Sequence, residues 1–149
     1  MSAALHLAKP EHLDTVLALV AAFHTESGLE SSDEHRRAGI EPLLNGHPYG
    51  AVYLIGPTRA PIGYIVITFG WSVEFGGMDG FVDELYIRPA VRGRGVATEV
   101  LTELPKSLAE AGVRALHLEV DRDNETAQRL YLRTRFQPRK NYILMTKSL

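Results

Sequence analysis

The chain has 149 residues, of which 45% are hydrophobic and 23% charged, a composition typical of one globular domain over residues 1–149. A formal net charge of -2 gives no general attraction for nucleic acid or an anionic membrane, so neither is expected as a partner. The chain has no cysteine and no histidine pair with ligand spacing, so we expect no metal site. The longest apolar run, residues 16–23, is too short to cross a bilayer, and a cytoplasmic protein is expected.

The hydrophobic spacing predicts alternating helices and strands. Apolar residues recur at helical spacing after Pro10 and before Gly112, whereas β-branched and aromatic runs bounded by Gly and Pro are typical of strands. Pro105 is expected to kink or interrupt its helix. The expected elements are a strand over 4–8, helices over 10–23 and 31–45, strands over 51–55, 62–69 and 80–88, a helix over 95–111, a strand over 116–120, a helix over 124–134 and a strand over 142–146. This order predicts an α/β fold with a mixed central sheet and helices on both faces.

The densest chemical signal is the segment 88–98, which lies between an expected strand and the long helix. Gly93 and Gly95 let the backbone approach a ligand closely, and the helix that follows favours an anion at its N-terminus. Arg92 and Arg94 add guanidinium donors that suit phosphate oxygens. The segment therefore predicts a phosphate-binding loop. The alternative is a glycine-rich turn with two solvated arginines.

Two other classes of phosphate site fit this loop less well. Val96 and Ala97 follow Gly95, where a P-loop would have Lys and Ser or Thr, which disfavours a nucleoside triphosphatase. A dinucleotide fingerprint needs a third glycine where Thr98 stands, and residues 89–92 separate the strand from the first glycine. Dinucleotide binding stays the less favoured alternative.

A second group of candidate residues lies in the expected helix over 124–134. Asn124 and Tyr131 are seven residues apart, so both project from one helix face, with the small Ala127 between them. A ligand or a strand can approach such a face closely. The alternatives are that Asn124 only caps the helix and that Tyr131 is a half-buried core aromatic.

Together, the two segments resemble the GCN5-related N-acetyltransferase (GNAT) superfamily. Arg92, Gly95 and Ala97 occupy the defining places of that family's R/Q-x-x-G-x-G/A pyrophosphate loop. Asn124 and Tyr131 fall where the family's N-x-x-A-x-x-L-Y helix has its cofactor-contacting Asn and its Tyr. The resemblance covers residues 79–136 well and the strand order of the first half loosely.

The resemblance implies acetyl-CoA as the cofactor. Its expected contacts are Leu85, Tyr86, Ile87, Arg92, Gly93, Arg94, Gly95, Val96, Ala97, Thr98, Asn124 and Tyr131. One departure is Arg135, which stands where the family often has Gly before a Phe. A non-Gly residue held in the left-handed conformation costs about 1 kcal/mol, so the local helix end is expected to differ without loss of a cofactor contact.

The resemblance also implies direct attack of an amine on the thioester. An alkylammonium group has a pKa of about 10.4 and needs a proton acceptor, for which Asp83 is slightly favoured and Glu84 is a close second. Strand alternation is expected to send these two carboxylates to opposite faces. Tyr131 is the candidate acid for the departing thiolate, and a backbone N–H near Ile87 is the candidate polariser of the carbonyl. The alternative is that both carboxylates are merely solvated or ion-paired.

Carboxylates and aromatic residues in segments 24–34 and 71–79 suit a cationic amine, and the resemblance implies that these segments flank the acceptor site. The acceptor is then a small molecule or a protein, and the alternative for these charges is a solvated face. The resemblance allows a homodimer. Two other functions remain open: a non-catalytic CoA-binding regulatory module and, less favoured, a dinucleotide-binding protein.

Overall fold

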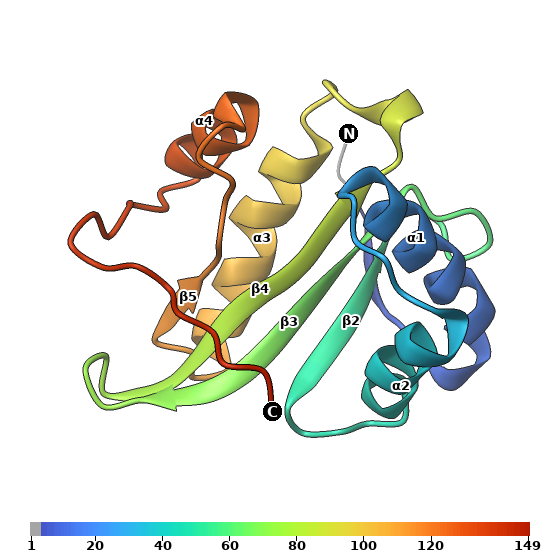
Figure 1. Ribbon diagram of the computed structural model, residues 1–149, viewed down its shortest axis with the longest axis horizontal. Coiled ribbons are helices and arrows are strands. Elements are labelled where there is room, and N and C mark those ends of the chain that lie inside the picture. The colour runs from blue at the N-terminus through green and yellow to red at the C-terminus, as the bar shows by residue number, and fades with distance from the viewer. Residues whose placement is uncertain (1–3) are drawn as a thin grey trace. The chain divides into compact units, whose positions relative to one another are not determined.

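The computed structural model describes residues 4–149 (Figure 1). The chain forms two compact units that divide between Glu119 and Val120. The first unit holds β1 (Leu5–Leu7), the 3₁₀ turn η1 (Pro10–His12), α1 (Leu13–Glu26), α2 (Asp33–Leu44), β2 (Gly50–Ile55), β3 (Gly63–Ser72), β4 (Gly77–Ile87), the 3₁₀ turn η2 (Pro89–Val91), α3 (Val96–Glu110) and β5 (Ala115–His117). The second unit holds α4 (Glu125–Arg133). A single domain over residues 1–149 stays a prediction.

The five strands form one sheet in the order β1-β2-β3-β4-β5. β1 to β4 pair antiparallel with their neighbours, and β5 joins the edge of β4 in parallel. The parallel step is possible because α3 provides the crossover between β4 and β5. The predicted α/β fold with a mixed sheet is confirmed.

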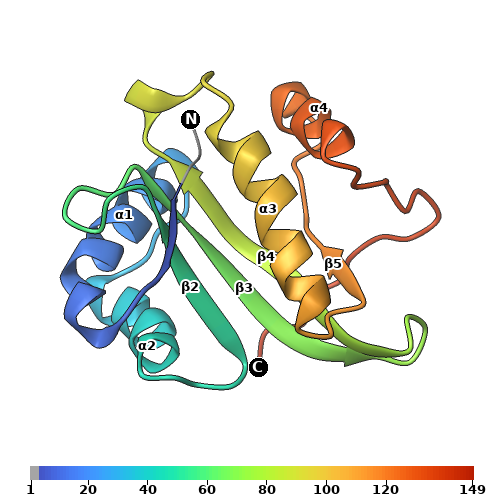
Figure 2. The ribbon, with the colours of Figure 1, turned by 180° about the vertical axis from the view of Figure 1, so that it is seen from behind.

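Helices cover both faces of this sheet. α1 and α2 lie on one face, and α3 lies on the other. Figure 2, the view from behind, shows α3 in front of the strands. The helices bury apolar stripes against the strands, and each such side chain contributes about 1.5–3 kcal/mol. The core under α1 and α2 contains Val16, Leu19, Val20, Ile40, Leu44, Val52, Leu54, Tyr64, Val66 and Tyr86.

Pro105 does not interrupt α3, so the expected interruption is wrong, and a kink stays a prediction. The helix runs from Val96 to Glu110 with the proline inside it. A proline in a helix interior costs about 3 kcal/mol, but α3 buries Val100, Leu101, Leu104 and Leu108. The burial of these four side chains is large enough to outweigh that cost.

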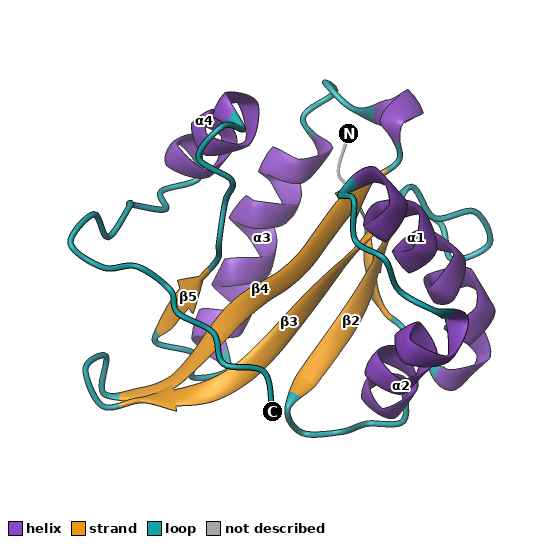
Figure 3. Cartoon of the chain, in the orientation of Figure 1, coloured by secondary structure: helices purple, strands orange, loops and turns teal. Residues whose placement is uncertain are grey.

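The last predicted strand is absent, and β5 is shorter than predicted. Residues 142–146 form no strand, and Figure 3 shows the C-terminal segment as loop. The side chains of Tyr142, Ile143 and Leu144 are exposed. An apolar run becomes a strand only where another strand supplies hydrogen-bond partners. Their own unit, residues 120–149, contains one helix and no strand.

Among residues 4–149, no helix combines the length and apolarity needed to cross a membrane.

Candidate functional site

The predicted phosphate loop joins β4 to α3 and ends in two left-handed glycines. Gly93 has a φ of 76° and Gly95, the N-cap of α3, a φ of 78°. No atom lies within 4 Å of a Cβ built on either glycine, so the requirement for Gly here is conformational and not one of space. No side chain caps α3, and the first amides of the helix point out of its N-terminus. These amides favour an anion.

The two arginines of the loop have different surroundings. Arg92 donates from Nε to the Ile87 carbonyl at 2.8 Å and from its terminal nitrogen to both Glu26 carboxylate oxygens, at 2.9 and 2.7 Å. Its guanidinium carbon also lies 5.6 Å from the centre of the Tyr86 ring. Arg94 is exposed. The structure therefore places Arg92 against α1, and it leaves the backbone amides and Arg94 facing outward.

One edge of β4 is open where it approaches this loop. β5 pairs with Asp79, Gly80 and Phe81 only, whereas β4 continues to Ile87. Within the first unit, residues 82–87 therefore have no strand partner on the β5 side. Tyr86 and Ile87 are buried, so their side chains belong to the core and a ligand could reach only their backbone. Unpaired strand amides beside an anion-binding loop suit an extended ligand that carries a phosphate.

The remaining predicted loop contacts lie in the first turn of α3. Val96, Ala97 and Thr98 are half-buried, and the Thr98 carbonyl accepts a hydrogen bond from the Thr102 hydroxyl at 2.7 Å. Their amides, and not their side chains, are the groups that an anion would meet. Leu85, on β4, is half-buried.

A β-bulge in β4 changes where the two candidate carboxylates lie. Glu84 pairs with Val66 and Val82 pairs with Ile67, so Asp83 is an extra residue between them. Strict alternation, which the sequence-based expectation assumed, fails here because the bulge breaks it. Glu84 shares the Val66 face of the sheet, which α1 covers, and its side chain is only 17% exposed.

Glu84 accepts hydrogen bonds at both of its carboxylate oxygens. The Tyr64 hydroxyl donates to Oε1 at 2.7 Å, and His24 Nε2 lies 2.6 Å from Oε2. Burial and the Glu84 charge raise the pKa of Tyr64 far above its ordinary value, so the phenol stays neutral and remains a donor. His24 comes from the last turns of α1, 60 residues away in sequence.

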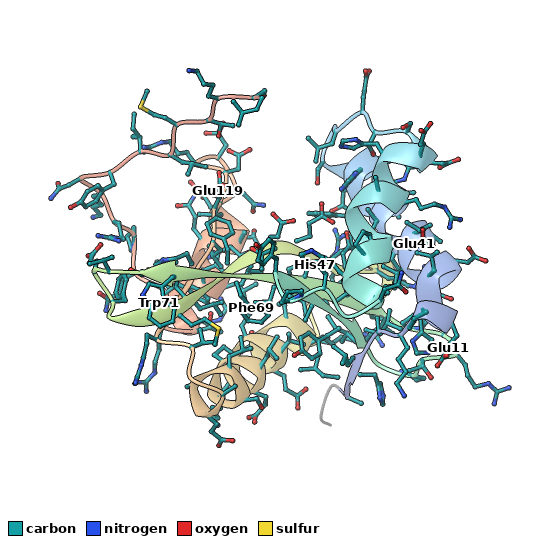
Figure 4. The ribbon with its side chains drawn as sticks, turned by 90° about the horizontal axis from the view of Figure 1, so that it is seen from below. Glu11, Glu41, His47, Phe69, Trp71 and Glu119 are labelled. Atoms are coloured by element: carbon teal, nitrogen blue, oxygen red, sulfur yellow. The ribbon has the colours of Figure 1, made fainter. Side chains whose placement is uncertain are left out.

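Asp83 lies in an acidic cluster with a changed proton affinity. Its surroundings desolvate it, which raises its pKa, and Glu84 and Glu119 raise it further, whereas His24 lowers it. Figure 4 shows Glu119 on the side of the sheet where α1 and α2 lie. Three carboxylates thus gather beside the bulge on that side of β4, and such a cluster attracts a cation.

The second unit carries the other two candidates. The Asn124 side-chain oxygen accepts from the Ala127 amide at 3.0 Å, so Asn124 is the N-cap of α4, which was one of its alternatives. Tyr131 is half-buried, and burial raises the pKa of its phenol. The approach of Asn124 and Tyr131 to the cofactor stays a prediction.

The end of α4 shows how Tyr131 is held within that unit. Phe136 N–H donates to the Tyr131 carbonyl and Arg135 N–H to the Leu132 carbonyl, the two bonds of a Schellman motif. The Tyr131 and Phe136 rings contact edge to face at 5.9 Å. Arg135 adopts a φ of 74°, so the helix end keeps the left-handed residue that Gly usually supplies, and the expectation of a different helix end is wrong.

Sequence reasoning missed His24, Ser31 and Tyr64 as members of the site. The segment 24–34 was singled out for its carboxylates, but nothing in the sequence connects His24 to Glu84. The only available signal was a histidine at the end of an otherwise apolar helix.

A mixed α/β sheet with an anion-binding loop, an open strand edge beside it and an acidic cluster on the adjacent face suits a protein that binds a phosphate-bearing ligand next to a cation. Residues 6–136 match the model of the acetyltransferase (GNAT) family, and the chain belongs to this family. The predicted family is thereby confirmed, and with it the acetyltransferase class.

Known proteins similar to the chain agree with this assignment. It is 32% identical over 71 residues to the uncharacterized N-acetyltransferase YycN of Bacillus subtilis (strain 168), and the match spans 48% of this chain and 44% of that relative. The integron cassette protein HFX_CASS3, from the mobile metagenome of Cole Harbour Salt Marsh, superposes with a TM-score of 0.84 at 28% identity, over 97% of this chain and 90% of that one. AAC(6')-Iy, in complex with the bisubstrate analogue CoA-S-monomethyl-acetylneamine, superposes with a TM-score of 0.80 at 16% identity over 100% of both chains, which shows a shared fold.

Proposed function

We propose that this chain transfers the acetyl group of acetyl-CoA to a primary amine of a small cationic molecule or of a protein, by direct attack of the amine on the thioester. The observation that carries this proposal is the position of the acidic cluster relative to the loop. Asp83 and Glu84 lie on the strand whose open edge ends at the anion-binding loop. One strand therefore presents a cation-attracting cluster and an anion-binding end.

The residues of the loop fit the proposed cofactor. A diphosphate needs several donors, and the amides of residues 95–98 with the exposed Arg94 supply them. Arg92 can bring its Nη2 to the diphosphate after that nitrogen leaves Glu26. Both side chains of that ion pair are 43% exposed, and such a pair is worth about 0–1 kcal/mol, so a diphosphate can displace it.

The reaction needs one proton acceptor and one proton donor. Acetyl-CoA supplies a thioester whose carbonyl carbon the amine attacks and whose sulfur leaves with the bonding electron pair. Asp83 first accepts a proton from the ammonium nitrogen, which frees the lone pair for attack. The raised pKa of Asp83 brings it nearer to neutral pH and improves it as a base.

The thioester carbonyl oxygen, which becomes negative when the amine attacks, needs a hydrogen-bond donor, and the leaving sulfur needs a proton donor. An N–H at the open edge of β4 near Ile87 is the donor for the oxyanion. Tyr131 is the proton donor for the sulfur and recovers a proton from the new amide nitrogen. In sum, an ammonium ion and acetyl-CoA give the amide, free CoA and one proton, which Asp83 returns to solvent.

The acceptor is proposed to be a small cationic amine in the first instance. Asp83, Glu84 and Glu119 supply negative charge on the sheet face, and an acetylated neamine conjugate of CoA occupies the AAC(6')-Iy complex. A protein lysine remains the other acceptor. A cytoplasmic location and a homodimer are further parts of the proposal.

Free-thiol release tests this function. The purified protein is incubated with acetyl-CoA and, in turn, a polyamine, an aminoglycoside and a lysine-containing peptide. The chain has no cysteine, so every thiol detected comes from the cofactor. We expect at least one amine to release thiol, and replacing Asp83 with Asn to lower its turnover by about 10²–10⁴-fold with cofactor affinity unchanged. Cofactor binding with no turnover on any amine would mean a CoA-binding module and not an enzyme.

A further inference from the structure

A chain of hydrogen bonds connects Arg36 of α2 to Glu84 of β4. Arg36 donates to the Ser31 hydroxyl at 2.9 Å, Ser31 Oγ lies 2.8 Å from His24 Nδ1, and His24 Nε2 lies 2.6 Å from Glu84 Oε2. The His24 side chain is only 14% exposed. Neither the reaction proposed above nor the acidic cluster by itself requires this series of hydrogen bonds.

The donors along the chain all point toward Glu84. A guanidinium can only donate, so Ser31 Oγ accepts from Arg36 and has one hydrogen to give, which the His24 Nδ1 lone pair can accept. With Nδ1 accepting, the ring hydrogen is on Nε2, which donates to Glu84. Tyr64 donates to the other oxygen. Glu84 therefore receives a fixed donor on each oxygen.

A carboxylate with a fixed donor on each oxygen is held in one orientation and has less acceptor capacity left for an approaching ammonium group. Asp83, at the bulge next to it, has different surroundings. Neighbouring groups partly desolvate Asp83 although it is exposed, which raises its pKa, and the Glu84 charge raises it further. The geometry thus gives the two carboxylates different surroundings: Glu84 is held by a donor on each oxygen, and Asp83 lies exposed at the bulge.

We propose that His24, acting through Glu84, is a positioning residue that holds this carboxylate as a fixed anion and leaves Asp83 as the proton acceptor for the amine. Ser31 and Arg36 fix the orientation and tautomer of His24. The proposal rests on the amine acetyltransferase function proposed above and assigns the roles of its two carboxylates. The groups that face the Asp83–Glu84 pair are His24 from α1, Tyr64 from β3 and Glu119 beyond β5.

Two substitutions at one position test the proposal. His24→Gln keeps an N–H donor near the place of Nε2, whereas His24→Phe keeps the ring volume and removes the donor. In His24→Phe the carboxylate loses its charge-assisted bond, so the pair binds its proton more tightly. We expect the acid limb of the kcat/KM profile to move about one pH unit upward and kcat to fall at least tenfold. His24→Gln should keep the limb within about 0.3 unit of the wild type.

Carbon-13 NMR of the side-chain carboxyls of Asp83 and Glu84 gives the same comparison without turnover. We expect the titration of the pair to move upward in His24→Phe and not in His24→Gln. Tyr64→Phe, which removes the other donor to Glu84, should move it in the same direction. An unchanged titration in both Phe variants, or an equal shift in His24→Gln, would overturn the proposal.

These readouts separate the two proposals. A shifted titration in a protein that acetylates no amine would leave the role of His24 intact and reject the function. Turnover with an unshifted titration would reject the role of His24 alone. Acetyl-CoA should protect each variant from heat as well as it protects the wild type, because the loop lies at the end of β4 and does not contain His24.

Discussion

Asp83 is the most exposed residue in its part of β4. The groups around it nevertheless raise its pKa. A raised pKa favours proton transfer to Asp83, because a base is most effective when its pKa is near the working pH. The same raised pKa lowers the free energy of unfolding at neutral pH, because the native state binds the proton of this carboxyl more tightly than the unfolded state does. Its contribution to stability is present at acid pH and is lost as the pH rises through the folded pKa.

The charge of Asp83 is expected to destabilise the native state at neutral pH. Asp83→Asn removes a charge that the native state disfavours, so at pH 7 we expect a higher Tm than that of the wild type. At a pH below the ordinary range of Asp, both proteins are neutral at this position and the difference should vanish. Thermal unfolding at both pH values checks this. A lower Tm at pH 7 would mean that the Asp83 charge stabilises the fold.

The sequence predicted the loop glycines well because their conformation is a local property of the residue type. Gly93 and Gly95 are the positions where a positive φ is needed, and both have one. The contact of His24 with Glu84 could not be predicted. It joins α1 to a strand 60 residues later, and it depends on a bulge that the sequence does not mark.

At the scale of elements, α1 and the phosphate loop are joined by one exposed ion pair. Glu26, at the end of α1, holds Arg92 of the loop, and His24 of the same helix holds Glu84. If Arg92 must leave Glu26 to reach the cofactor, Glu26→Gln should tighten CoA binding. An exposed pair is worth at most about 1 kcal/mol, so the gain should stay below about fivefold. Calorimetric titration with CoA measures it, with Glu30→Gln as a control, and weaker binding in Glu26→Gln would show that Glu26 supports the loop.

The helix end of α4 gives a second prediction at this scale. Arg135 keeps a φ of 74° in a position that Gly occupies without strain. Arg135→Gly should therefore stabilise the second unit by about 1 kcal/mol. Urea unfolding measures the difference. The neighbouring substitution Arg133→Gly, inside the helix, should instead destabilise by about 1 kcal/mol. A loss of stability in Arg135→Gly would show that the Arg side chain contributes more than the strain costs.

Element prediction succeeded where the pattern is amphipathic and failed where the outcome depends on neighbours. The apolar spacing of α1 and α3 predicted both helices, since burying that stripe requires a helix. The same spacing could not show that burial along α3 would outweigh Pro105. It also could not show that residues 142–146 would lack a strand partner.

At the scale of the whole molecule, the sheet brings two chemistries to one strand. The first unit holds β4, whose open edge leads to the anion-binding loop and whose bulge presents Asp83 and Glu84. The family match, residues 6–136, extends from the first unit into the second, and the candidates Asn124 and Tyr131 lie in the second unit. We therefore propose that the cofactor phosphates bind in the first unit.

A thermal-shift titration against acetyl-CoA, CoA and NADH tests this central claim most directly. Ligand at 100 times its dissociation constant adds about 2.7 kcal/mol to stability, which corresponds to roughly 5–10 °C for a domain of this size. The account predicts a rise of that size with acetyl-CoA and CoA and none with NADH. No rise with either CoA compound, or a rise with NADH alone, would contradict the assignment of the loop and the acetyltransferase function with it.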